Sequence, residues 1–136
     1  MGAAMAPAAY ETLRTHFDDL SLSPSDYDLI VTGDLGLVGS EVLIDFFKSD
    51  GVDLAPHYND CGLMIFSLEE QDVHAGGSGC GCSASVLCGH LLNSMRAGRW
   101  KKILFAATGA LLSPTSTMQG ESIRSICCAV SISQTR

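Results

Sequence analysis

The sequence predicts an α/β fold in which helices pack against a sheet of buried strands. Short apolar runs of strand length recur at residues 27–32, 62–66, 103–108 and 126–132, and near-continuous runs of this kind are typical of strands buried on both faces. Between them lie stretches in which apolar side chains recur every three or four residues, which is the spacing of one helix face. Strands and helices that alternate along a chain in this way indicate a layered α/β domain.

Composition indicates a chain that forms a buried core. The 136 residues suit one domain or part of one, and 46% of them are hydrophobic against 17% charged. The net charge of −7, without a basic cluster, argues against a nucleic-acid partner. No apolar run reaches the roughly 18 residues that a membrane span needs, and the N-terminus lacks the pattern of a secretory signal. Six cysteines in a chain without an export signal predict a reducing compartment such as the cytoplasm.

The N-terminal part is predicted to form a helix and then the first strand. The helix begins at Pro7, a residue that suits a first helical turn, and it ends near Leu20. A turn at residues 23–26 separates it from the strand at 27–32. The apolar stripe of this helix consists of Ala9, Leu13, Phe17 and Leu20.

A second helix is predicted after a turn at residues 33–36. Ser40 is its expected N-cap, because a serine hydroxyl can accept a hydrogen bond from an orphan backbone N–H, and the helix ends at residues 49–51. Asp34 and Asp60 lie at strand ends, where they are expected to cap turns.

The C-terminal part is predicted to contain a glycine loop, a long helix and two strands. Ser83 is the expected N-cap of the helix, which ends near residues 97–98. The strand at 103–108 follows. A polar loop over residues 112–124 then leads to the last strand, at 126–132.

The glycine loop is the predicted wall of a ligand pocket. Glycines at positions 76, 77, 79 and 81 precede the helix start. Such a loop leaves several N–H groups pointing one way, and the helix dipole favours an anion there. Two cysteines, Cys80 and Cys82, stand at the same point. Tight packing of a buried helix is the alternative, since glycines and small residues also allow two backbones to come close.

The same segment carries the residue types of a metal site without the spacing of one. Cys80 and Cys82 form a Cys-x-Cys pair, whereas structural zinc sites use gaps of two to four residues and a second pair. We therefore expect neither a metal nor another cofactor. A dyad of Cys80 and His74 lacks an evident third group to orient it, so we do not expect this pair to be catalytic. The other metal-ligand types nearby are Cys88 and His90.

Five runs of the sequence carry a resemblance to a known family. They are YDLIVTGDLG (27–36), DCG (60–62), QDVHAGGSGCGCSA (71–84), TGALLSP (108–114) and QGESI (119–123). They resemble the stage V sporulation protein AD family of spore-forming bacteria, and the resemblance extends over almost the whole chain.

The resemblance implies a thiolase-like fold, with a mixed sheet and layered helices. It also implies binding of dipicolinic acid, the small pyridine dicarboxylate stored in spores. The expected partners are membrane proteins of the same stage V sporulation A operon, with which the protein would move that compound into the developing spore. The expected location is the cytoplasm, at the periphery of the spore inner membrane.

The resemblance is to the C-terminal half of that family, so residues 1–136 are expected to form a partial C-terminal thiolase-like domain. Each half of a thiolase-like chain has a five-stranded sheet, and the first, central strand of the second half is missing here. That strand would lie between the strand at Leu29 and the strand at Leu104. Its neighbours would lose hydrogen bonds worth roughly 0.5–1.5 kcal/mol each. We therefore expect a marginally stable chain that closes the gap by rearranging or by pairing with another molecule, and a homodimer through the thiolase-like interface.

The resemblance also implies binding in place of catalysis. In the condensing enzymes of this superfamily the nucleophilic cysteine lies in the first half, and Cys80 stands here where the second half would supply a histidine. A thiol cannot replace imidazole at neutral pH, because its ordinary pKa is about 8.5. The alternatives are an acyltransferase half-domain and a docking module for a membrane channel. The expected ligand-binding residues are Gly79, Cys80, Gly81, Cys82, Ser83, Thr108, Gly109 and Ser113, with the last three in or near a second glycine loop at 108–110.

Overall fold

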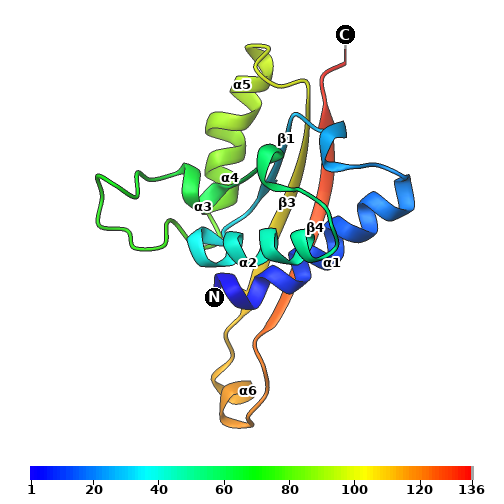
Figure 1. Ribbon diagram of the computed structural model, residues 1–136. Helices are drawn as coiled ribbons and strands as arrows, with labels where there is room; N and C mark the ends of the chain where they lie inside the picture. Colours follow the sequence, from blue (N-terminus) through cyan, green and yellow to red (C-terminus); the bar gives the residue numbers. More distant parts are fainter. Residues whose placement is uncertain (136) are drawn as a thin grey trace.

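The computed structural model describes residues 1–135 and contains one four-stranded sheet with helices on both faces (Figure 1). β1 is parallel to β2 and to β3, whereas β4 is antiparallel to β3. The predicted α/β class and mixed sheet are therefore confirmed. In the order β2-β1-β3-β4 across the sheet, the strands are β2 (Tyr58–Asp60), β1 (Leu29–Thr32), β3 (Lys102–Leu111) and β4 (Arg124–Ser133).

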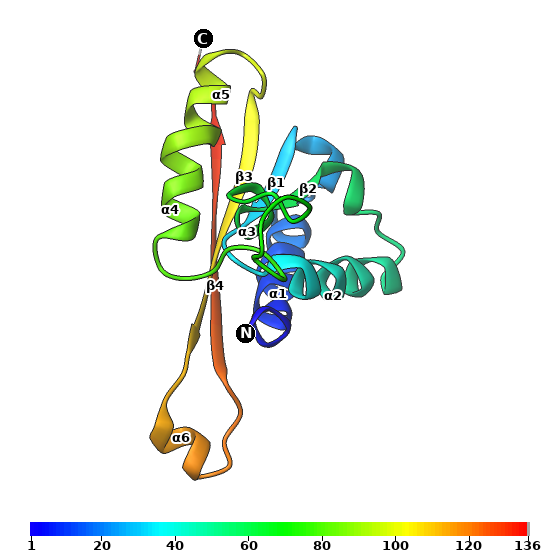
Figure 2. The same cartoon turned by 90° about the vertical axis from the view of Figure 1, so that its left-hand side faces the viewer.

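Two long helices, α1 (Gly2–Leu20) and α2 (Gly36–Ser49), cover one face of the sheet (Figure 2). They cross closely at Gly2 and Gly39, where a Cβ on Gly39 would lie 2.7 Å from the backbone carbon of Gly2. α1 begins upstream of the predicted start at Pro7, because Met5 and Ala6 are buried in the same core as the predicted stripe. That core includes Leu13, Phe17, Tyr27, Ile30, Leu43, Phe47 and Leu104.

The other face is covered by one helical stretch that is interrupted by a π-helical turn. It consists of α4 (Cys82–Val86), the π-helix η3 (Leu87–Leu91) and α5 (Leu92–Arg96), and it stands on the side of the sheet away from α1 and α2 (Figure 2). The predicted long helix is confirmed. Its buried side chains meet the sheet in a second core of Leu29, Val31, Val86, Leu91, Met95, Ile103 and Phe105.

The gap expected in the middle of the sheet is closed. β1 pairs directly with β3, with Leu29 opposite Ile103 and Thr32 opposite Ala106. The facing backbone groups of the two strands therefore have each other as partners, which corresponds to the rearrangement that we predicted as one of two outcomes. The marginal stability of the chain remains a prediction.

The prediction of a strand at residues 62–66 is wrong. The edge strand β2 lies earlier, and the chain then enters the short helix α3 (Cys61–Met64). Asp60 starts this helix by accepting a hydrogen bond from the backbone N–H of Gly62. Two 3₁₀ helices, η1 (Pro24–Asp26) and η2 (Ala55–His57), lead into β1 and β2 respectively.

The prediction that Ser40 is an N-cap is also wrong. α2 starts at Gly36, so Ser40 lies inside the helix, where it is buried. Gly36 has a φ of +63°, a conformation that glycine adopts without the steric penalty of a Cβ. The hydroxyl of Ser40 accepts a hydrogen bond from the Tyr58 hydroxyl at 3.0 Å, so it links α2 to the edge strand instead of capping the helix.

β3 and β4 are longer than predicted and form a hairpin that projects from the body of the protein (Figure 1). Thr108 and Gly109 lie within β3, opposite Cys127 and Ile126, so the glycine loop expected at 108–110 is a strand. The polar loop at its tip contains the short helix α6 (Pro114–Met118). We call residues 109–126 the hairpin arm. Among residues 1–135, no helix combines the length and the apolar character that crossing a membrane requires.

Candidate ligand site

The buried carboxylate of Asp60 organises the edge of the sheet from which the site is built. It accepts hydrogen bonds from the backbone N–H groups of Leu35, Gly36 and Gly62, each at 2.9 Å, and from the Thr32 hydroxyl at 2.6 Å. Burial raises the pKa of Asp60 above its ordinary value, while these four donors oppose the rise. Asp60 thus holds the starts of α2 and α3 against the end of β1, and its predicted role as a turn cap is confirmed.

A tyrosine completes this buried network. The Tyr58 hydroxyl lies 2.6 Å from the hydroxyl of Thr32 and donates to Ser40. Burial raises the pKa of Tyr58, so the phenol stays neutral. The sequence alone did not predict this network, because its members lie far apart along the chain and each is an ordinary residue type for a strand or a helix.

Asp34, in the turn after β1, joins the glycine loop to β3. Its Oδ1 accepts a hydrogen bond from the Thr108 hydroxyl at 2.9 Å, and its Oδ2 accepts from the Gly79 N–H at 3.1 Å and from the Ser78 hydroxyl at 3.3 Å. The backbone N–H of Asp34 donates in turn to Thr108 Oγ1 at 3.0 Å. Asp34 therefore brings together two predicted site residues, Gly79 and Thr108. Its carboxylate accepts the hydrogen bonds that the Gly79 N–H and the Thr108 hydroxyl can donate.

The glycine loop lines a hollow of about 310 Å³ at the start of α4, which is at the small end of the range of ligand pockets. Gly79 has a φ of +110° and open space where a Cβ would stand. Within residues 1–135, the backbone N–H groups of Cys80 and Gly81 have no hydrogen-bond acceptor. Ile65 and Phe66 form the apolar wall of the hollow, and the other lining residues are Gly77, Ser78, Gly79, Cys80, Gly81, Cys82 and Ser85.

The start of α4 differs from the prediction. The N-cap position is Gly81, and no side chain caps the helix there. Ser83 lies inside the first turn, so its predicted role as N-cap is wrong. The backbone N–H groups of Ser83 and Ala84 accordingly find no acceptor among the described residues, as expected for the first turn of an uncapped helix.

Four of the predicted site residues do not line this hollow: Ser83, Thr108, Gly109 and Ser113. Ser113 is the N-cap of α6 and accepts a hydrogen bond from the Ser116 N–H, at the far tip of the hairpin arm (Figure 1). Gly109 is a strand residue whose neighbour across the sheet is Ile126. The candidate site therefore consists of residues 79–82, with Thr108 attached to it through Asp34.

The two buried thiols near the glycine loop, Cys61 and Cys82, are poor nucleophiles. Burial raises the pKa of the Cys61 thiol to about 12, and burial also raises the pKa of Cys82. The thiolate is the reactive form of cysteine, so both side chains are inert at neutral pH. Cys80 is exposed and makes no hydrogen bond to a histidine in the described part of the chain. His74 lies beside Asp72 on the exposed loop, with 3.8 Å between Nδ1 and Oδ1.

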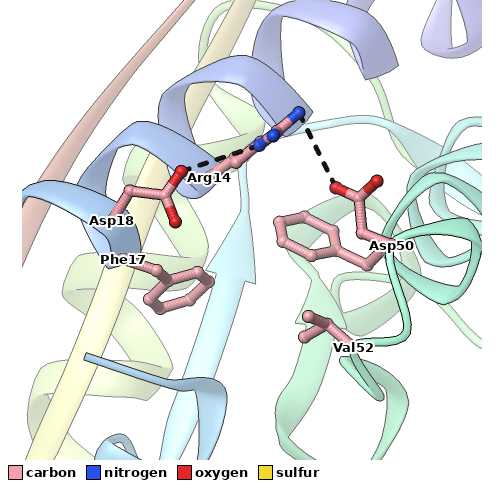
Figure 3. Close-up of a pocket in the computed structure, with 6 residues that line it drawn as sticks. Arg14, Phe17, Asp18, Asp50 and Val52 are labelled. Atoms are coloured by element: carbon pink, nitrogen blue, oxygen red, sulfur yellow. Dashed lines mark ion pairs between the residues drawn. The ribbon is translucent and has the colours of Figure 1, made fainter. Parts of the chain in front are cut away.

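A second hollow, of about 330 Å³, lies between α1 and α2 (Figure 3). Its one cation, Arg14, pairs with Asp18 at 3.6 Å and with Asp50 at 3.8 Å. The Tyr10 hydroxyl, 3.1 Å from Arg14, also hydrogen-bonds to Asp50. Since this guanidinium is already neutralised by carboxylates, the hollow is a less suitable anion site than the glycine loop. Among residues 1–135, no group of three or more His, Cys, Asp or Glu side chains is arranged to hold a metal ion.

Fold and site together define an α/β protein with a small hollow that is lined by a glycine loop. The family model described as "Stage V sporulation protein AD (SpoVAD)" matches residues 1–133. The "Stage V sporulation protein AD" of Bacillus subtilis (strain 168) is 49% identical to the chain over 126 residues, a match that covers 93% of this chain and 37% of that relative. The chain belongs to the stage V sporulation protein AD family, and it spans well under half the length of this relative.

Proposed function

We propose that the chain is the C-terminal part of a non-catalytic, thiolase-like sporulation protein that binds dipicolinic acid and supports its uptake into the developing spore. The observation that carries this proposal is the hollow at the glycine loop. Two residues that line it, Cys80 and Gly81, have backbone N–H groups without an acceptor among residues 1–135. Free N–H donors beside a helix start favour an anion.

The chemistry of dipicolinic acid suits such a site. One carboxylate would accept hydrogen bonds from the N–H groups of Cys80 and Gly81, each worth roughly 1.5–3 kcal/mol because the acceptor is charged. The flat ring would lie against the apolar wall of Ile65 and Phe66. Two hydroxyl groups are also close, those of Ser78 and Thr108, and in the structure both donate to Asp34.

A binding role agrees better with the thiols than acyl transfer does. An acyltransferase needs an activated nucleophile, whereas burial raises the pKa of Cys61 and of Cys82. We therefore propose that no residue of this chain is catalytic. The thiolase-like fold is supported by the mixed sheet with helices on both faces.

The role in sporulation rests on family membership. The B. subtilis relative carries the name stage V sporulation protein AD. We propose that this chain acts with membrane proteins of the corresponding operon at the periphery of the spore inner membrane, and that it forms a homodimer through a thiolase-like interface.

A direct test compares two substitutions at one position. Gly81→Pro removes the N–H of Gly81, and its φ of −90° is close to the range of proline. Gly81→Ala keeps that N–H and adds a Cβ into open space. We expect calorimetric titration with dipicolinate to give an affinity at least about tenfold weaker for Gly81→Pro and nearly unchanged for Gly81→Ala. Equal affinities for the two variants, or no saturable binding to the wild-type chain, would contradict the proposed site.

A docking module for a membrane channel is the second candidate, and the hairpin arm favours it. Apolar side chains are unusually exposed there, with Met118 88% and Leu111 63% accessible, and exposed apolar clusters mark interaction sites. The double substitution Leu112→Ser and Met118→Ser should abolish co-purification with the operon's membrane proteins and leave dipicolinate affinity unchanged. Retained co-purification would remove this candidate.

A further inference from the structure

Three donors at the glycine loop are already taken by a carboxylate of the chain itself. The Gly79 N–H and the Ser78 hydroxyl donate to one oxygen of Asp34, and the Thr108 hydroxyl donates to the other. These donors come from two separate segments, the loop and β3. They surround the two oxygens of Asp34 as a binding site would surround a ligand carboxylate.

We propose that Asp34 is an internal competitor for the carboxylate of the ligand and thereby sets the affinity of the site. This inference rests on the proposed function, since it concerns the same hollow. Ser78 and Gly79 both line that hollow, so the Asp34 carboxylate lies at its edge and holds donors that would otherwise serve a bound anion.

Two physical effects make Asp34 and a bound carboxylate exclude each other. The first is the count of donors: each of these N–H and O–H groups has one hydrogen to donate, and Asp34 uses all three. The second is electrostatic repulsion, because two negative charges a few ångströms apart repel each other. A dicarboxylate therefore binds through the free N–H groups of Cys80 and Gly81 alone, or it displaces Asp34 from the other three donors.

A purely structural role of Asp34 leads to the opposite expectation. If its contacts only fasten the loop to β3, then removing the carboxylate loosens the loop and weakens ligand binding. Competition predicts tighter binding after the same change. The sign of the change in affinity thus separates the two roles, whatever happens to the stability of the chain.

The test is calorimetric titration of the full 136-residue chain with dipicolinate. Asp34→Ala should bind it about tenfold more tightly than the wild type, or better. Asp34→Asn keeps the shape and one acceptor oxygen but loses the charge, so it should show a smaller gain and serves as the second variant if Asp34→Ala unfolds. Adding Thr108→Val to Asp34→Ala should cancel most of the gain, because it removes one of the freed donors.

Asp28 provides the matched control. Its carboxylate also accepts two backbone N–H groups, those of Lys101 at 2.7 Å and Lys102 at 2.9 Å, but it precedes β1 whereas Asp34 follows it. Asp28→Ala changes the net charge equally at the other end of the strand. We expect its dipicolinate affinity to stay within about twofold of the wild type, since solvent and salt screen a charge at that distance.

The outcomes distinguish this inference from the function on which it rests. If the wild type binds dipicolinate and Asp34→Ala and Asp34→Asn bind it equally or more weakly, the competitor role is overturned and the binding function stands. A gain shared by Asp28→Ala would reduce the effect to net charge and would also overturn it. If neither the wild type nor any variant binds dipicolinate, the proposed function itself fails.

Discussion

Replacing Asp60 with alanine is expected to lower the free energy of unfolding by about 4 kcal/mol. The carboxylate is fully buried, and it is the acceptor for the backbone N–H groups of Leu35, Gly36 and Gly62. Each buried donor left without a partner costs about 1–3 kcal/mol. Three such donors give about 3–9 kcal/mol, and we take the lower part of that range because water can enter the space vacated by the side chain.

Urea denaturation monitored by circular dichroism measures this loss. With an m-value of about 1.5 kcal/mol/M, a loss of about 4 kcal/mol moves the midpoint down by about 2.7 M. Asp60→Asn keeps one acceptor oxygen and should lose about half as much. Asp53→Ala is the control, since Asp53 is exposed and makes no hydrogen bond within residues 1–135; it should stay within about 0.5 kcal/mol of the wild type.

The result that would refute this reasoning is an Asp60→Ala midpoint as close to the wild type as that of Asp53→Ala. The starts of α2 and α3 would then not depend on this carboxylate. The pH dependence gives a second check. Because burial raises the folded pKa of Asp60, its contribution to stability is fully present below the unfolded pKa of about 3.9 and decreases as pH rises through the folded value. Asp60→Asn should lack that decrease.

Three further predictions concern packing, titration and thiol exposure. Gly62→Ala should lower the free energy of unfolding by about 1–3 kcal/mol, because the added Cβ would overlap the Gly77 carbonyl oxygen. Gly89→Ala places its Cβ in open space and should stabilise the helix by roughly 0.5–1 kcal/mol. Equal urea midpoints for the two variants would contradict this prediction. Backbone N–H groups of Lys101 and Lys102 hold the pKa of Asp28 below its ordinary value, so its contribution to stability is present above a pH of about 3.9 and is lost as pH falls through the folded pKa. Asp28→Asn should therefore lose less stability on acidification than the wild type. The same dependence of stability on pH in both proteins would refute this prediction. In the folded chain a thiol reagent should label three cysteines quickly and three only after unfolding, as counted by mass spectrometry. Early labelling of a buried cysteine would contradict its burial in the core. The expected fast group is Cys80, Cys88 and Cys128, and the slow group is Cys61, Cys82 and Cys127.

The glycine loop illustrates how far the sequence alone could predict the site. The glycines before the helical pattern indicated a hollow at this loop, and the loop does line one. This could be predicted because residues that are close in sequence are also close in space. The partners of the loop were not predictable in the same way. Asp34 is separated from Gly79 by 45 positions and Thr108 from Asp34 by 74, and nothing in the local pattern around Asp34 indicates that its carboxylate lies on the loop.

Ser113 shows the complementary failure. It follows Thr108 by five positions, and we expected both residues to bind the ligand. β3 continues as a strand through Leu111, and an extended chain rises about 3.3 Å per residue. Ser113 is carried to the tip of the hairpin arm, where it caps α6.

The sequence by itself determined the elements whose signal is periodic. The apolar stripe of α1 and the long helix after the glycine loop follow from apolar side chains that recur every three or four residues. β1 and β3 follow from near-continuous apolar runs, and both patterns are local properties of the chain. Only the tertiary structure decided which strands are neighbours, where α2 and α3 begin, and which donors remain free at the hollow. Those outcomes depend on single contacts between distant residues, chiefly the carboxylates of Asp60 and Asp34, because a buried N–H group takes whichever acceptor the completed fold brings within reach.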